Sequence, residues 1–195
     1  MSVADSKWIG AGAPNSVTGG ILVAPLGTTL PSTSSAAPGA AFIKLGYVSE
    51  DGLDPQGDRK SDSIKDWFGD IIAQLQSEHS VRFGLSLYSV WDADVLGEVF
   101  GPDNITVTAP TASAGTLITV KETGSVLPRR SWIFDMAHEG KKLRIVLPNA
   151  KISEVKEGKM TSKELAKFDI TIEAFKDSSG VKAYRYLDDG VTTGP

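Results

Sequence analysis

The sequence predicts a mainly β protein: an antiparallel β-sandwich or partly closed barrel with one short flanking helix, an extended N-terminal arm and a long hairpin loop. Residues 81–88 and 166–174 alternate apolar and polar side chains with a period of two, which is typical of half-buried strands. Only residues 92–100 show apolar side chains at helical spacing. Because strands do not alternate with helices along the chain, we expect antiparallel pairing.

The first strand is expected at residues 21–24, after a Gly-, Ala- and Ser-rich segment, 1–19, that is typical of a flexible arm. A Thr-, Ser- and Pro-rich loop, 27–40, follows, and its polarity predicts that it is disordered or committed to a partner. The second strand is expected at 42–48. We expect the β-sandwich domain to span residues 20–188.

Next comes a long stretch of turn chemistry, Glu50 to Asp62, in which Asp-Gly, Asp-Pro and Gly-Asp pairs follow one another. It predicts a long hairpin loop. A return strand is expected at 64–75, with large apolar residues on both faces. The clearest strand of the chain is expected within 80–91.

The single helix begins at Asp92, which is expected to act as its N-cap. Val95, Leu96 and Val99, with Phe100, form its apolar stripe, and the Gly-Pro pair at 101–102 ends it.

The second half of the chain is rich in expected strands. They lie at residues 105–108, 116–122, 131–137, 143–147, 150–155, 165–176 and 183–187. The sequence from Thr161 to Glu164 resembles a capping box and allows one helical turn before the strand that follows. Residues 189–195 are polar and are expected to form a flexible C-terminal tail.

Composition limits the possible functions. The chain has 195 residues, no cysteine and two histidines that lie far apart, His79 and His138, so thiol chemistry, disulfides and a histidine-rich metal site within one chain are excluded. The net charge of −4 and the lack of a basic cluster argue against tight binding of nucleic acid. No apolar run is long enough to span a membrane, and no secretory signal is expected at the N-terminus.

No catalytic motif stands out, so we expect no enzymatic activity, no metal and no cofactor. The acidic stretch 54–62 lacks the ligand spacing of a calcium loop. Asp92 and Asp94 are better explained by helix capping than as a catalytic pair, because side chains two residues apart do not share a helix face. Three tryptophans could form a sugar-binding platform, but their strand-like context favours core or subunit packing: Trp67, Trp91 and Trp132.

The net charge is concentrated in one region. Residues 50–70 contain seven acidic and three basic side chains, and the acidic and basic side chains of the remaining sequence cancel. A solvated loop explains this distribution. The functional alternative is an acidic surface that faces something to which it must not bind.

Four segments, in their order along the chain, carry a resemblance to a known family. They are residues 45–52 (LGYVSEDG), 66–69 (DWFG), 83–87 (FGLSL) and 95–101 (VLGEVFG). With the N-terminal arm and the β-rich second half, this layout resembles the major tail protein, or tail tube protein, of bacteriophages with long non-contractile tails. The resemblance covers residues 21–187.

The resemblance implies a structural virion protein that is assembled in the host cytoplasm. Copies would form hexameric rings with a continuous inner barrel, drawn here from residues 42–48 and 64–91. Stacked rings would form a hollow tube through which DNA passes without specific binding. Contacts with the tape measure, tail tip and tail terminator proteins are also implied, and no membrane is involved.

Residue roles follow from the same resemblance. The loop that contacts the next ring is expected to contain Glu50, Asp51, Leu53, Asp54, Asp58, Arg59, Lys60 and Asp62. Asp66 and Asp70 are expected to face an electronegative lumen, and Arg129 and Arg130 are candidate basic partners for the acidic loop.

Three alternatives remain open on the sequence. A carbohydrate-binding or adhesin β-sandwich would show exposed aromatic side chains on one sheet face and stay monomeric. A tube protein of a contractile tail or secretion system would share most of these features. An enzyme on a β-sandwich would need clustered carboxylates or a histidine site.

Overall fold

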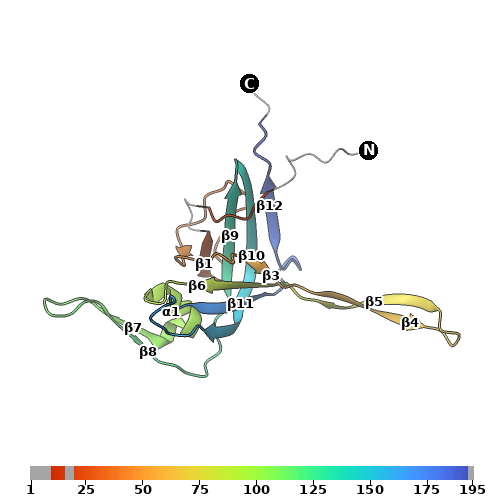
Figure 1. Ribbon diagram of the computed structural model, residues 1–195. Coiled ribbons are helices and arrows are strands. Elements are labelled where there is room, and N and C mark those ends of the chain that lie inside the picture. The colour runs from red at the N-terminus through yellow and green to blue at the C-terminus, as the bar shows by residue number, and fades with distance from the viewer. Residues whose placement is uncertain (1–9, 16–19, 193–195) are drawn as a thin grey trace.

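The computed structural model describes residues 10–15 and 20–192 of the chain (Figure 1). The expected terminal segments, 1–19 and 189–195, therefore lie partly outside the described residues. Within 10–15, Ala13 and Asn15 form backbone hydrogen bonds with residues 137 and 135 of strand β9.

The strands are β1 (Ile21–Pro25), β2 (Ile43–Lys44), β3 (Asp54–Pro55), β4 (Arg59–Lys65), β5 (Ile71–His79), β6 (Arg82–Leu87), β7 (Ile105–Thr108), β8 (Leu117–Val120), β9 (Arg130–His138), β10 (Lys141–Glu157), β11 (Phe168–Ala174) and β12 (Tyr184–Asp188). The helices are α1 (Ala93–Phe100) and the short 3-10 helix η2 (Pro102–Asn104).

One eight-stranded antiparallel sheet forms the body: seven strands follow the order β2-β1-β9-β10-β11-β6-β3, and β12 pairs with β10 outside this order. The long strand β10 joins its two halves. Its first half pairs with β9 on one edge and β12 on the other, and its second half pairs with β11. β9, β10 and β12 stand upright in Figure 1, whereas β6 and β11 lie across beneath them, so the sheet folds over itself like a sandwich without closing into a barrel.

The core lies where these two halves and helix α1 meet. Phe83, Leu85 and Leu87 of β6 are buried and stand opposite Ile172, Ile170 and Phe168 of β11. Trp132 and Phe134 of β9 are buried in the same cluster. The period-two pattern thus assigned the buried faces of β6 and β11 correctly.

Helix α1 covers one side of this core. The Asp92 carboxylate accepts a hydrogen bond of 2.9 Å from the backbone amide of Asp94, which satisfies an amide that has no partner within the helix. Val95, Leu96 and Val99 are buried against the sheet. The expected helix, its cap and its apolar stripe are confirmed.

The prediction of a strand over residues 42–48 is wrong for most of that range. Only Ile43 and Lys44 pair with β1. Gly46 then takes a positive φ of 75° and redirects the chain, so that the carbonyl of Tyr47 and the amide of Ser49 bond to the end of β6 instead. One segment therefore contributes to two different edges of the sheet.

Two further expectations in the second half need correction. The strands expected at 143–147 and 150–155 are one strand, because a bulge at Pro148 keeps the ladder continuous and the Pro148 carbonyl accepts a hydrogen bond of 2.9 Å from the Ser131 hydroxyl. Thr161 accepts hydrogen bonds from the amides of Lys163 and Glu164 as a cap does, yet the chain only bends there and forms no helical turn.

The loop at 27–40 was expected to be too polar to pack, and the structure shows otherwise. Arg144 of β10 donates hydrogen bonds to the carbonyls of Thr33 and Ala36. Leu30 packs against a second small core that contains Phe42. The loop is held on the body by one buried guanidinium and a few apolar contacts.

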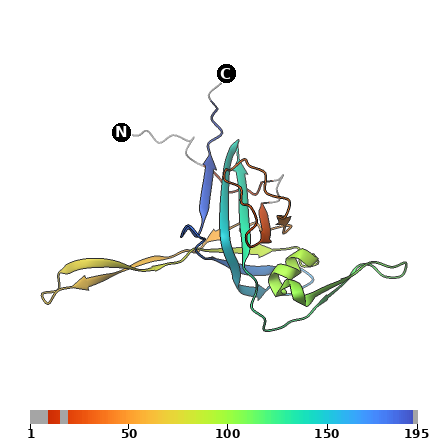
Figure 2. The ribbon, with the colours of Figure 1, turned by 180° about the vertical axis from the view of Figure 1, so that it is seen from behind.

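Two hairpins leave the body on opposite sides. β4 and β5 form one, and β7 and β8 form the other (Figures 1 and 2). Both views show the β4–β5 hairpin extending far from the sheet. We call this hairpin, residues 59–79, the long arm.

Candidate assembly surfaces

The long arm replaces a loop and a single return strand that the sequence predicted. Arg59 pairs with His79 at its root, and Lys65 pairs with Ile71 near its tip. Residues 59–62, expected within the loop, are in β4, and the expected return strand is interrupted by a turn at 66–70. The sequence reading was wrong here because Trp67 and Phe68 look like strand residues although they stand in the turn.

The tip of the arm is a tight turn fixed by one carboxylate. Asp66 accepts hydrogen bonds of 2.9 Å from the amides of Phe68 and Asp70, and its backbone carbonyl accepts from Gly69. Gly69 has a φ of 92°, which favours glycine. Trp67 and Phe68 are thereby held outward, with 98% and 92% of their surface exposed.

The two faces of the arm differ in polarity. Cross-strand pairing puts Ser61 with Gln76 and Ser63 with Gln74 on one face. The other face carries Ile64 with Ala73 and Asp62 with Leu75. Ile64 and Leu75 are 44% and 58% exposed, because no part of the body lies over them. A two-stranded ribbon is at best marginally stable alone, and an exposed apolar face of this kind is typical of surfaces that a partner covers.

The expected stacking loop is divided between two parts of the fold. Residues 49–56 lie along β6, where Ser49 and Gln56 donate backbone hydrogen bonds to Ser86 and Arg82. Leu53 packs against the core. This part of the expected hairpin loop therefore contributes to the subunit core. Asp58, Arg59, Lys60 and Asp62 belong to the root and first strand of the long arm.

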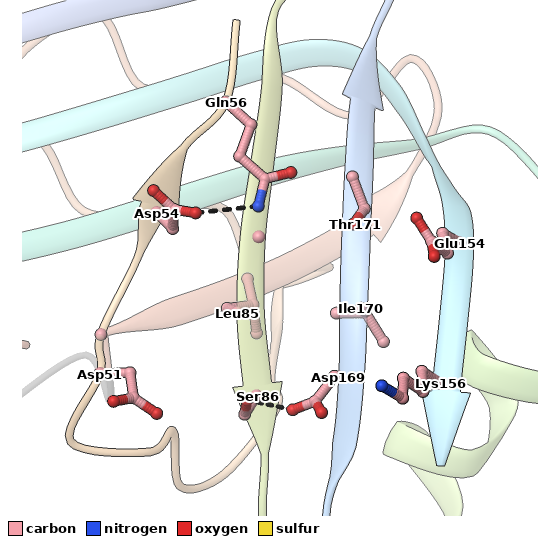
Figure 3. A pocket seen from close by; sticks show the side chains of 12 residues that line it. Asp51, Asp54, Gln56, Leu85, Ser86, Glu154, Lys156, Asp169, Ile170 and Thr171 are labelled. Atoms are coloured by element: carbon pink, nitrogen blue, oxygen red, sulfur yellow. Dashed lines mark hydrogen bonds between the residues drawn. The ribbon is translucent and has the colours of Figure 1, made fainter. Parts of the chain in front are cut away.

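Within the segment 49–56, Asp51, Asp54 and Gln56 border a hollow on the outer face of the sheet (Figure 3). Asp51 and Asp54 approach it from the β3 side, and Glu154 and Lys156 project from β10 on the other side. Asp169 lies between them. Most of the charged side chains around the hollow are thus carboxylates, and such a surface suits a partner with basic side chains.

Hydrogen bonds fix the charges in this hollow. The Ser86 hydroxyl donates to Asp169, and the Lys167 ammonium lies 3.1 Å from the same carboxylate. The hydrogen bond from Ser86, and then Lys167, lower the pKa of Asp169 below its ordinary value. The Gln56 amide donates to Asp54 at 2.9 Å, so Asp54 is also oriented.

A second hollow lies at the root of the long arm and has the opposite character. Residues from β3, β6 and β12 line it together with the arm itself. Its charged side chains are three cations, Arg59, Arg82 and Arg185, and one carboxylate, Asp58. The sequence did not reveal this site, because Arg185 lies more than 100 residues beyond the other two.

Comparison with known proteins decides the family. A family model described as phage tail tube protein matches residues 4–194. The chain belongs to the phage tail tube protein family. It is a structural component of the virion, in the tube of the tail. No curated protein matches the sequence.

Solved structures similar to this tail tube protein include a component of the anti-feeding prophage and components of an extracellular contractile injection system, PVC. The cap that terminates the tube of the anti-feeding prophage is 14% identical, with 96% of this chain and 100% of that chain covered and a TM-score of 0.44. The PVC sheath-tube complex in the extended state is 12% identical, with 95% and 100% covered and a TM-score of 0.38. The PVC sheath/tube terminator is 11% identical, with 85% and 91% covered and a TM-score of 0.38.

The tail tube protein does not bring its candidate catalytic residues together. Asp92 caps helix α1, and His79 and His138 lie in β5 and β9. No group of three or more His, Cys, Asp or Glu side chains that could hold a metal forms among residues 10–15 and 20–192. Within the same residues, no helix has the length and apolar character needed to cross a membrane.

The tryptophans and the candidate basic partners are also separated. Trp132 is buried in the core, whereas Trp67 and Trp91 are exposed on different elements, so the three do not form one platform. Arg130 is paired with Glu98 at 3.0 Å, and the Arg129 guanidinium lies 4.2 Å from the centre of the Phe175 ring. Burial raises the pKa of Glu98, and Arg130 opposes that shift.

Proposed function

We propose that this tail tube protein assembles into hexameric rings that stack into the hollow tube of a long non-contractile tail, and that DNA passes through this tube into the host. The observation that carries the proposal is the long arm, whose apolar face is left exposed by the described part of its own chain. A second copy of the chain is the natural cover. The role is structural, and no catalytic step is proposed.

A head-to-tail arrangement follows from the position of the arm. It leaves one side of the body, while helix α1 and the β7–β8 hairpin occupy the opposite side (Figure 2). A contact between two different surfaces repeats from copy to copy and closes into a ring when the rotation permits. Apolar residues on the arm, among them Ile64 and Leu75, would gain stability by burial on the neighbour.

The polar face of the arm suits the wall of a bore. Ser61, Ser63, Gln74 and Gln76 carry no charge and would offer no strong grip on phosphate groups. We propose that this face lines the lumen and that the acidic residues of the arm tip, Asp66 and Asp70, lie at the edge of the bore. DNA would then slide past without specific binding.

We assign the stacking of the rings to the surface around the carboxylate-bordered hollow on the outer face of the sheet. We propose that Glu50, Asp51 and Asp54, with Leu53 anchoring their segment, meet basic side chains of the next ring. Asp58, Arg59, Lys60 and Asp62 act instead through the root of the arm. The two ends of the finished tube would bind the tape measure, tail tip and terminator proteins.

Electron microscopy of the purified full chain tests this proposal. We expect rings with sixfold symmetry that lengthen into hollow tubes as the protein concentration rises. In the parent virion, the same tube should stand without a contractile sheath around it. A protein that stays monomeric at high concentration would contradict the assembly, and rings of another symmetry would contradict the hexamer.

A further inference from the structure

We propose that the arm tip of one copy docks in the arginine-lined hollow at the arm root of the next copy, with Asp70 facing Arg59 and Arg185. This inference rests on the proposed ring assembly and names the contact that closes the ring. It is carried by three charged side chains, Arg59, Arg185 and Asp70, that have no hydrogen-bonding or ionic partner among the described residues of one copy.

The first set lies in the hollow. The guanidinium groups of Arg59 and Arg185 make no hydrogen bond or ion pair with any residue in the described part of the chain. Arg82, beside them, reaches Glu173 at 3.5 Å on an exposed surface. On the rim, Lys182 donates a hydrogen bond to the His79 carbonyl. Cations therefore predominate around this hollow, and two of the guanidinium groups have free donors.

The second set lies at the tip. The Asp66 carboxylate already accepts two backbone hydrogen bonds within the turn. The Asp70 carboxylate makes no hydrogen bond or ion pair within residues 10–15 and 20–192. Beside it, Trp67 and Phe68 are almost fully exposed. The tip thus presents one free carboxylate and two aromatic rings.

These two sets match in chemistry. A guanidinium group can bind a carboxylate through two parallel hydrogen bonds, and its flat face stacks on aromatic rings. Asp70 would satisfy the free donors of Arg59 and Arg185, while Trp67 or Phe68 covers their faces. Opposite charges at such a contact also fix which surfaces meet.

The length of the arm makes this a contact between copies. β4 has seven residues and β5 has nine, so at about 3.3 Å per residue the tip lies roughly 23–30 Å from its own root. A tip therefore cannot reach the hollow of its own chain. Arms joined tip to root would form a closed polygon, and Asp70 would then lie in the contact between two copies, at the edge of the bore.

A disulfide test is direct because the chain has no cysteine. In the double variant Asp70→Cys/Arg185→Cys, every disulfide must join two copies. After mild oxidation of assembled tubes, we expect a non-reducing gel to show a ladder beyond the dimer that ends at the number of copies in a ring. Each single variant should give no band above the dimer.

The matched control moves one cysteine to the other hairpin. Asp70→Cys/Ala112→Cys pairs the tip with an exposed residue between β7 and β8, and it should give no ladder. An equally strong ladder from this control would overturn the proposal. Tubes from the test variant that give no ladder would overturn it too, while leaving the ring assembly standing.

Charge exchange gives a second readout. Asp70→Arg and Arg185→Asp should each raise the protein concentration needed for assembly roughly tenfold, and the combined variant should recover most of that loss. Unchanged melting temperatures would show that the subunits are folded. Assembly that is unaffected by the single changes, or is not recovered by the exchange, would contradict the docking. If the unaltered protein forms no ring at all, it is the proposed function that fails.

Discussion

Arg144 and Asp135 form a buried ion pair across the β9–β10 ladder, with two hydrogen bonds of 2.5 and 2.8 Å between guanidinium and carboxylate. Only 3% and 2% of their surfaces are exposed. Arg144 also donates to the carbonyls of Thr33 and Ala36, so one side chain connects the sheet to the 27–40 loop. This pair explains why a Pro- and Ser-rich loop stays on the body.

Breaking the pair should destabilise the subunit strongly. Arg144→Met leaves the Asp135 carboxylate buried without a partner, so we expect it to lower the free energy of unfolding by about 3–5 kcal/mol. Urea unfolding measures the loss, and limited proteolysis should show faster cleavage within residues 27–40. The double variant Asp135→Leu/Arg144→Met removes both charges and should recover much of the stability. A single variant as stable as the parent would contradict a buried pair.

The buried face of β6 gives a prediction for core packing. Leu85→Ala removes a side chain enclosed by β11 and helix α1, and we expect a loss of about 2–5 kcal/mol in the free energy of unfolding. Val107→Ala in the exposed hairpin is the control and should stay within about 0.5 kcal/mol of the parent. Chemical denaturation of both variants gives the comparison. Equal losses would show that the burial of β6 has been misassigned.

The Ser86–Asp169 hydrogen bond makes a pH-dependent contribution. Because the pKa of Asp169 is lowered from its ordinary value of 3.8, first by Ser86, the folded state favours the ionised carboxylate. The resulting stability is complete above the ordinary pKa and is lost as the pH falls through the lower, folded value. We expect Ser86→Ala to cost more stability at pH 7 than near pH 3, as measured by urea unfolding. Ser61→Ala on the long arm is the control. If the loss of stability in Ser86→Ala does not change with pH, the hydrogen bond from Ser86 is not what lowers the pKa of Asp169.

Strands with one buried face were the most predictable part of the fold. In β11 burial alternates as the sequence does. In β6 the apolar side chains all face the core as the sequence predicts, although residues 49–56 also cover Gly84 and Ser86 between them. The helix was equally clear, since Asp92 and the Gly-Pro pair mark its ends. These signals are local, and they agree with the tertiary structure.

The sequence failed where distant contacts decide the structure. Nothing near Arg144 indicates that it will hold carbonyls more than 100 residues away. Pro148 was taken for a strand break, but Ser131 on the neighbouring strand supports a bulge there. The turn at 66–70 did leave a signal, an Asp followed three residues later by Gly, which the two aromatic residues between them obscured.

The apolar face of the long arm gives the last prediction. Leu75→Ser should weaken assembly, because a buried aliphatic side chain contributes about 1.5–3 kcal/mol and this one is covered only when a neighbour docks. That loss corresponds to a rise of about 10- to 100-fold in the concentration needed for rings. Sedimentation at a series of concentrations measures it.

The matched control lies on the opposite face of the same strand. Gln74→Ser shortens a side chain that points the other way, so it should leave the assembly concentration within about threefold of the parent. Both variants should melt at the parent temperature, because the arm makes no contact with the core. If Leu75→Ser and Gln74→Ser weaken assembly equally, the neighbour does not distinguish the two faces, and the assignment of the apolar face to the subunit contact is wrong. If Leu75→Ser instead lowers the melting temperature of the monomer, the arm folds back on its own body in solution.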